Sequence, residues 1–91
     1  MTADDRRRIW QGIWPKETPL ADDVDLRFLA HEYKFTGGNI KNEALAAAFL
    51  AAEDGSPVTM SHLLQAIRRE YQKLGKAVPD LGEGLAVGGG R

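Results

Sequence analysis

The chain of 91 residues contains no cysteine, which excludes disulfide bonds, cysteine-bound metals and the small secreted scaffolds that depend on disulfides. Its longest apolar run, residues 44–52, is about half of the ~20 residues that a membrane-spanning helix needs. An excess of charge of either sign is also lacking. The 12 basic and 13 acidic residues leave a net charge of −1, with no general attraction to nucleic acid or to an anionic membrane.

Residues that commonly bind metals or carry catalysis are few. The 2 histidines, His31 and His62, lie in different predicted helices and lack the spacing of a zinc motif, and no GxxxxGK[ST] phosphate loop is present. The acidic pairs at residues 4–5 and 22–23 precede helix starts, where exposed carboxylates are ordinary. We therefore expect no metal site and no catalytic residue here. The N-terminal residues 1–8 lack the apolar stretch of a secretory signal, which favours a cytoplasmic protein.

Helical periodicity dominates what is present. A first helix carries Ile9, Trp10, Ile13 and Trp14 and is stopped by Pro15. A second, of about two turns, begins near Asp25 and presents residues 26, 29, 30 and 33 on one face. Between them lies a linker at residues 16–23.

Two further helices have clear start and stop signals. The third has Thr36 as its N-cap and Gly55 at its end, and the fourth has Thr59 as its N-cap and Gly75 at its end. Apolar residues cover much of the circumference of the third helix, so we expect it to be central and surrounded by neighbours. Residues 57–58 can add a short extended segment.

These patterns predict an all-α fold: a small four-helix domain over residues 1–76, followed by a flexible, glycine-rich tail at residues 77–91. The tail carries half of the chain's 10 glycines and shows no periodic pattern. The domain is small, yet an alanine-rich centre that packs tightly can let it fold alone.

Trp10 and Trp14 lie one turn apart in a domain with little room to bury two indoles. They either anchor the core or form an exposed surface that a neighbour covers. The second reading makes the chain a self-standing helical interaction module that binds a partner helix or a second copy through the Trp10/Trp14 surface.

Two basic clusters, residues 6–8 and residues 68, 69 and 73, raise nucleic-acid binding as a third reading, which the near-neutral net charge disfavours. Solvated helix faces are the ordinary alternative. The pair Gly37 and Gly38 in the first turn of the third helix is costly for helix stability, so it needs a reason, such as the close approach of a ligand or of another helix.

Four segments follow one another in a recognisable order over roughly residues 6–74. They are Ile9-Trp10-Gln11-Gly12-Ile13, residues 19–30, Phe35-Thr36-Gly37-Gly38-Asn39-Ile40 and residues 58–67. The most specific pieces are the acidic-Val-Asp-Leu segment before the second helix, the aromatic-Thr-Gly-Gly start of the third, the alanine-rich helix and the Val-Thr-Met start of the fourth. In this order the segments resemble the C-terminal helical lid subdomain of an AAA+ ATPase.

The resemblance implies a lid that packs over ATP or ADP held by a larger α/β domain. In the family, two positions on the first lid helix and the small pair that opens the third contact the adenine and ribose. Those positions correspond here to Ile9, Ile13, Gly37 and Gly38. Two glycines let a flat base approach a helix N-terminus, whose dipole favours a nearby phosphate.

The start of the third helix departs from the family pattern at two positions, Gly38 and Asn39. Gly38 stands where alanine is commoner. Asn39 stands where many members have aspartate and others have an arginine that reaches the γ-phosphate, so we include Asn39 among the nucleotide-binding residues while noting that the arginine is absent. Lys41 is better read as a surface residue than as a replacement for that arginine.

The resemblance further implies that the chain is part of a longer ATPase and hydrolyses nothing by itself. The phosphate loop and the magnesium-binding residues would belong to the large α/β domain of the same parent. The lid would relay nucleotide state to the neighbouring protomer of a homo-oligomeric ring. Neither a membrane nor nucleic acid is an expected partner.

Overall fold

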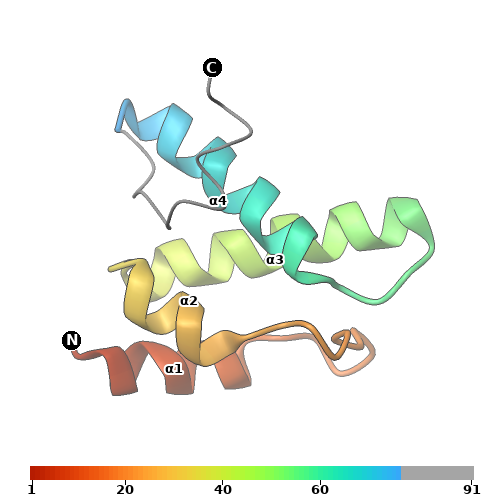
Figure 1. Ribbon diagram of the computed structural model, residues 1–91, viewed down its shortest axis with the longest axis horizontal. Helices are drawn as coiled ribbons and strands as arrows, with labels where there is room; N and C mark the ends of the chain where they lie inside the picture. The colour runs from red at the N-terminus through yellow and green to blue at the C-terminus, as the bar shows by residue number, and fades with distance from the viewer. Residues whose placement is uncertain (77–91) are drawn as a thin grey trace.

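The computed structural model describes residues 1–76, and the tail predicted at residues 77–91 lies outside this part. The described part contains four helices and no strand, which confirms the predicted all-α class. Figure 1 shows α1 and α2 packed together, α3 crossing the middle of the molecule and α4 on its far side. The helices are α1 (Ala3–Gly12), α2 (Leu26–Glu32), α3 (Gly37–Asp54) and α4 (Met60–Leu74). None of them combines the length and the apolar character that crossing a membrane requires.

Short-range polar contacts begin and end these helices. The hydroxyl of Thr36 accepts from the Asn39 amide and that of Thr59 accepts from the His62 amide, as predicted from the two caps. Gly55 and Gly75 end α3 and α4 with φ of 67° and 69°, the left-handed conformation that favours glycine. Each signal acts over three or four residues, so the sequence predicts it directly.

The first helix differs in detail from the prediction. It begins at an unforeseen capping box, in which the Thr2 hydroxyl accepts from the Asp5 amide and the Asp5 carboxylate accepts from the Thr2 amide. It ends at Gly12, earlier than the periodicity suggested, with Ile13 as its C-cap. Pro15 is the physical reason, because it lacks an amide proton and keeps Trp14 out of the helical conformation.

A parallel bridge joins the loop before α2 to the loop before α4. The Val58 amide donates to the Pro19 carbonyl at 3.0 Å, and the Ala21 amide donates to the Val58 carbonyl at 2.7 Å. The Met60 amide, at the start of α4, donates to the Asp23 carboxylate at 3.2 Å. The predicted extended segment at residues 57–58 is therefore confirmed, and it ties the α1–α2 linker to the far side of the molecule.

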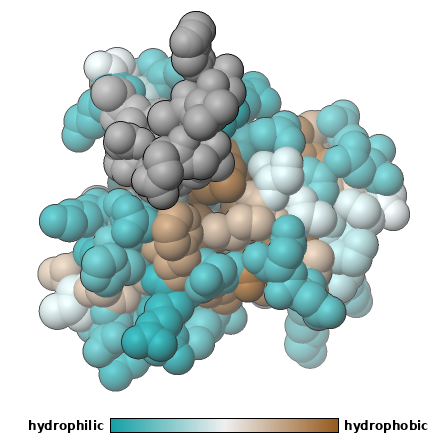
Figure 2. All heavy atoms as spheres, in the orientation of Figure 1, coloured by the Kyte–Doolittle hydropathy of each residue, from teal (hydrophilic) through white to brown (hydrophobic). Residues whose placement is uncertain are grey.

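The core lies where α3 meets α1 and α4 and where α2 closes the end near Tyr33. Figure 2 shows apolar residues gathered across the middle of one face, bordered by hydrophilic ones. Tyr33 stacks on Phe35 with ring centroids 5.8 Å apart, and Tyr71 of α4 meets both rings. The buried apolar residues are Trp10, Leu29, Ala30, Tyr33, Phe35, Ile40, Ala44, Ala47, Ala51, Val58, Leu63, Ala66 and Ile67.

The prediction that neighbours surround α3 is wrong. Among residues 1–76, the helices that pack against α3 are α1 and α4, and they leave one side of it uncovered. This side is open to solvent and carries Leu45 and Phe49, whose exposed fractions are 51% and 63%. Hydrophobic periodicity alone could not distinguish this open apolar side from a packed one, because alanine and leucine fit both.

Candidate functional site

The structure brings Ile9 of α1 against Gly37 at the start of α3. A Cβ atom added to Gly37 would lie 3.6 Å from Cδ1 of Ile9, with no other contact within 4 Å. The two residues belong to segments far apart in the chain, and the packing of α1 on α3 joins them. Two of the predicted residues, Ile9 and Gly37, therefore lie close together, and both are half-buried.

The first turn of α3 is held by Thr36 and Asn39. The Thr36 amide donates to Oδ1 of Asn39 at 3.1 Å, the Thr36 hydroxyl donates to the same oxygen at 3.0 Å, and the Asn39 amide donates to the Thr36 hydroxyl at 3.1 Å. The first backbone bond of the helix runs from the Ile40 amide to the Thr36 carbonyl. The amides of Gly37 and Gly38 precede that bond, so they are the donors that the helix leaves for an outside acceptor.

The other predicted residues hold different positions. Ile13 caps the end of α1, where its amide donates to the Ile9 carbonyl at 3.0 Å, and its side chain packs partly on the core. Gly38 is exposed, and a Cβ there would meet only the Thr36 hydroxyl, at 3.8 Å. Asn39 uses its side-chain oxygen for capping, which gives it a structural role that the sequence did not reveal.

The two tryptophans do not form the exposed surface that one reading of the sequence required. Trp10 is fully buried, at 0% exposure, and Trp14 is half-buried, with ring centroids 6.3 Å apart. Both indole Nε1 atoms are buried without an acceptor in the described residues. The prediction of a Trp10/Trp14 docking surface is therefore wrong, because α1 turns Trp10 into the core against the neighbouring helices.

Arg6 is likewise not part of a solvated basic face. It is 7% exposed, and its Nε donates to the Ala30 carbonyl at 2.7 Å. That carbonyl belongs to the last turn of α2, where helix carbonyls lack partners within the helix. Arg6 therefore stabilises the α1–α2 pair. Arg8 pairs with the Asp5 carboxylate and Lys73 with the Glu70 carboxylate, so each basic cluster has a residue that already pairs within the chain.

A buried pair of carboxyl groups joins α3 to α4, and sequence reasoning missed it. Glu43 is 2% exposed and Glu70 is 8% exposed. The pKa of Glu43 is raised to about 8, chiefly by burial and then by the hydrogen bond to Glu70 and the charge of Glu70, whereas Lys73 acts to lower it. The Lys73 ammonium lies 3.3 Å from Oε1 of Glu70. The pair therefore holds a proton in neutral solution, as close carboxyl groups do when both cannot ionise.

A shallow cavity of about 180 Å³ lies beside this pair. Its lining mixes apolar and charged side chains from both helices: Asn42, Glu43, Ala46, Leu50, Ala66, Arg69, Glu70 and Lys73. The sequence does contain a signal for the pair. Glu43 is three residues after Ile40 and Glu70 is three after Ile67, so each lies on the apolar side of its helix.

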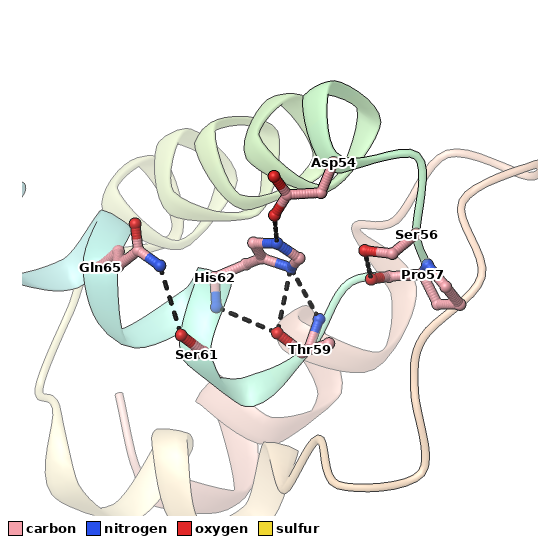
Figure 3. Close-up of polar contacts among 7 residues, drawn as sticks. All are labelled: Asp54, Ser56, Pro57, Thr59, Ser61, His62 and Gln65. Atoms are coloured by element: carbon pink, nitrogen blue, oxygen red, sulfur yellow. Dashed lines mark hydrogen bonds and ion pairs between the residues drawn. The ribbon is translucent and has the colours of Figure 1, made fainter.

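The α3–α4 turn contains a polar network centred on His62, shown in Figure 3. The ring Nδ1 accepts from the Thr59 amide at 3.0 Å, so the ring proton lies on Nε2, which is 2.7 Å from the Asp54 carboxylate. His62 is buried in the first turn of α4, where it forms a capping box with Thr59. No group of three or more metal-ligating side chains occurs among residues 1–76.

Comparison with protein families gives no match to this chain, and comparison with curated proteins gives none either. The resemblance to an AAA+ lid therefore stays a prediction. Within residues 1–76, the contact between Ile9 and Gly37 is the feature of the fold that bears on it most directly.

Proposed function

We propose that this chain is the helical lid of a cytoplasmic AAA+ ATPase and that it contacts the adenine and ribose of ATP or ADP. The observation that carries the proposal is that Ile9 lies next to Gly37: a Cβ atom added to Gly37 would be 3.6 Å from Cδ1 of Ile9. This proximity joins the two helices from which the lid of such an enzyme meets its nucleotide. Ile13 and Gly38 complete the proposed contact surface, and Asn39 supports its backbone.

The chemistry of these residues suits a flat, partly apolar ring followed by phosphates. Ile9 and Ile13 offer aliphatic side chains, and the amides of Gly37 and Gly38 offer two donors at the positive end of an 18-residue helix. Gly37 has no side chain, so a ring can approach its backbone beside Ile9. A larger residue there would fill the space that the ring needs.

The proposed role does not include catalysis by this chain. The Ile9–Gly37 region offers aliphatic side chains and backbone amides, which bind but do not transfer protons. The phosphate loop and the residues that hold magnesium would come from a large α/β domain of the parent ATPase. The neighbouring protomer of a homo-oligomeric ring would receive the motion of the lid when the nucleotide changes.

An NMR titration of the chain with ATP and with ADP tests the proposal. We expect weak binding, with amide shifts confined to the neighbourhood of Ile9, Ile13 and Gly37. Gly37→Ala adds a methyl group at ordinary van der Waals distance from Ile9, so the fold is retained while the shifts are reduced several-fold. Gly12→Ala is the matched control, because a Cβ there meets nothing within 4 Å.

Two outcomes contradict the proposal. Shifts that are absent, or that are equal in Gly37→Ala and in Gly12→Ala, place no nucleotide at this contact. Hydrolysis of ATP by the purified chain contradicts the assignment of catalysis to another domain.

A further inference from the structure

The open side of α3 carries one row of residues spaced by four: Lys41, Leu45, Phe49 and Glu53. All four are exposed, and the two apolar members are the exposed large hydrophobic side chains of the helix, at 51% for Leu45 and 63% for Phe49. Small residues, Ala46 and Ala52, border the row and are also exposed. Rows with this spacing form the ridges that interdigitate in the commonest class of helix packing.

The row is self-complementary about the level of Ala47. Lys41 and Glu53 lie six residues on either side of that level, and Leu45 and Phe49 lie two residues on either side. If a second copy of α3 lies antiparallel on the first, a two-fold axis at this level brings Lys41 opposite the second copy's Glu53. The same axis brings Leu45 opposite the second copy's Phe49.

The charges at the two ends of the row favour a second copy of this chain over an unrelated protein as the partner. Neither Lys41 nor Glu53 forms an ion pair within residues 1–76, and they are too far apart along α3 to meet each other. In an antiparallel pair, each Lys41 meets a Glu53 of the other copy, and the apolar side chains between them are covered. A parallel pair would instead set Lys41 against Lys41 and Glu53 against Glu53, which repel.

We propose that the row Lys41, Leu45, Phe49 and Glu53 is a homodimer surface, on which two copies of the chain pair through antiparallel α3 helices. The interface is isologous, since both copies contribute the same four residues and are related by a two-fold axis. One helix pair is at the low end of specific interfaces, below roughly 1,200 Å², so the association is weak and reversible. This dimer is independent of the proposed nucleotide contact, because none of its four residues lies at Ile9 or Gly37.

Sedimentation equilibrium of the 91-residue chain over about 10 μM to about 1 mM tests the proposal. We expect the mean mass to rise from 10.0 kDa toward about twice that value as concentration increases. Phe49→Glu replaces an exposed side chain, so the fold is kept, as circular dichroism can verify. The dissociation constant should rise about tenfold or more.

Charge exchange separates this geometry from non-specific apolar association. Lys41→Glu places like charges opposite each other at both ends and should weaken the dimer about threefold or more. Combining it with Glu53→Lys restores opposite charges and should return the dissociation constant to within about twofold of the original. Arg27→Glu, at an exposed position of α2, is the matched control and should leave it unchanged.

The proposal is overturned if the chain stays monomeric over this concentration range, because the open face is then covered by another segment or another protein. It is also overturned if the chain dimerises but the double charge exchange fails to restore what Lys41→Glu removes.

Discussion

Replacing Glu43 by glutamine should remove a large part of the pH dependence of this domain's stability. Glu43 is buried between α3 and α4, and its pKa rises from 4.5 to about 8 on folding, chiefly because burial disfavours the charged form. Between these two values the folded protein keeps a proton that the unfolded chain has released. The stability contributed by this proton is complete below pH 4.5 and falls as the pH rises toward 8.

The size of the effect follows from that interval. About three and a half pH units separate 4.5 from about 8, and at about 1.4 kcal/mol per unit they correspond to an upper limit of roughly 5 kcal/mol. The neighbouring cavity lets water reach the ionised pair, and Lys73 lies close by, so we expect roughly 2–4 kcal/mol in practice. That is a large share of the stability of a small domain.

The Glu43→Gln variant keeps the shape of the side chain and cannot ionise. Its amide donates to the Glu70 carboxylate, as the protonated Glu43 carboxyl does, so the α3–α4 packing is retained. The free energy of unfolding of the variant should therefore be nearly flat where that of the natural chain falls. At pH 8 the variant should be the more stable protein.

Urea unfolding followed by circular dichroism, from about pH 5.5 to about pH 8.5, measures the difference. Glu53→Gln, at an exposed position of the same helix, is the control and should follow the natural chain. Parallel pH profiles for the natural chain and Glu43→Gln would refute the reasoning, since the buried carboxyl pair would then hold no proton that folding retains.

Two other substitutions test the packing of the helices. Arg6→Met keeps the aliphatic bulk but leaves the Ala30 carbonyl without its buried donor, so the free energy of unfolding should fall by about 1–3 kcal/mol in urea denaturation. A loss below the error of that measurement would mean that water replaces the guanidinium. Gly55→Ala forces a side chain into φ of 67° and should cost about 1 kcal/mol in the same assay, whereas Gly12→Ala, where φ is ordinary and space is open, should be neutral or stabilising. Equal effects of the two alanines would contradict this account of the α3 terminus.

Part of the candidate site was predictable from residues close together in the chain. Thr36 is a good N-cap, and the paired glycines after it are unusual in a first helical turn, so the start of α3 could be singled out. That Ile9 lies on Gly37 depends on how α1 docks on α3. The residues between them in the sequence contain no local signal for that docking.

The sequence by itself determined the four helices and most of their ends, because caps, glycines with positive φ and the stop at Pro15 act through contacts within a few residues. The exceptions are the Thr2 cap of α1 and its end at Gly12. The tertiary structure decided which faces became interior. It buried Trp10 and Arg6, enclosed Glu43 with Glu70 and left Leu45 and Phe49 exposed. Helical periodicity shows that a face is apolar, but its burial depends on whether another helix packs there, and that is settled by the fit of the whole chain.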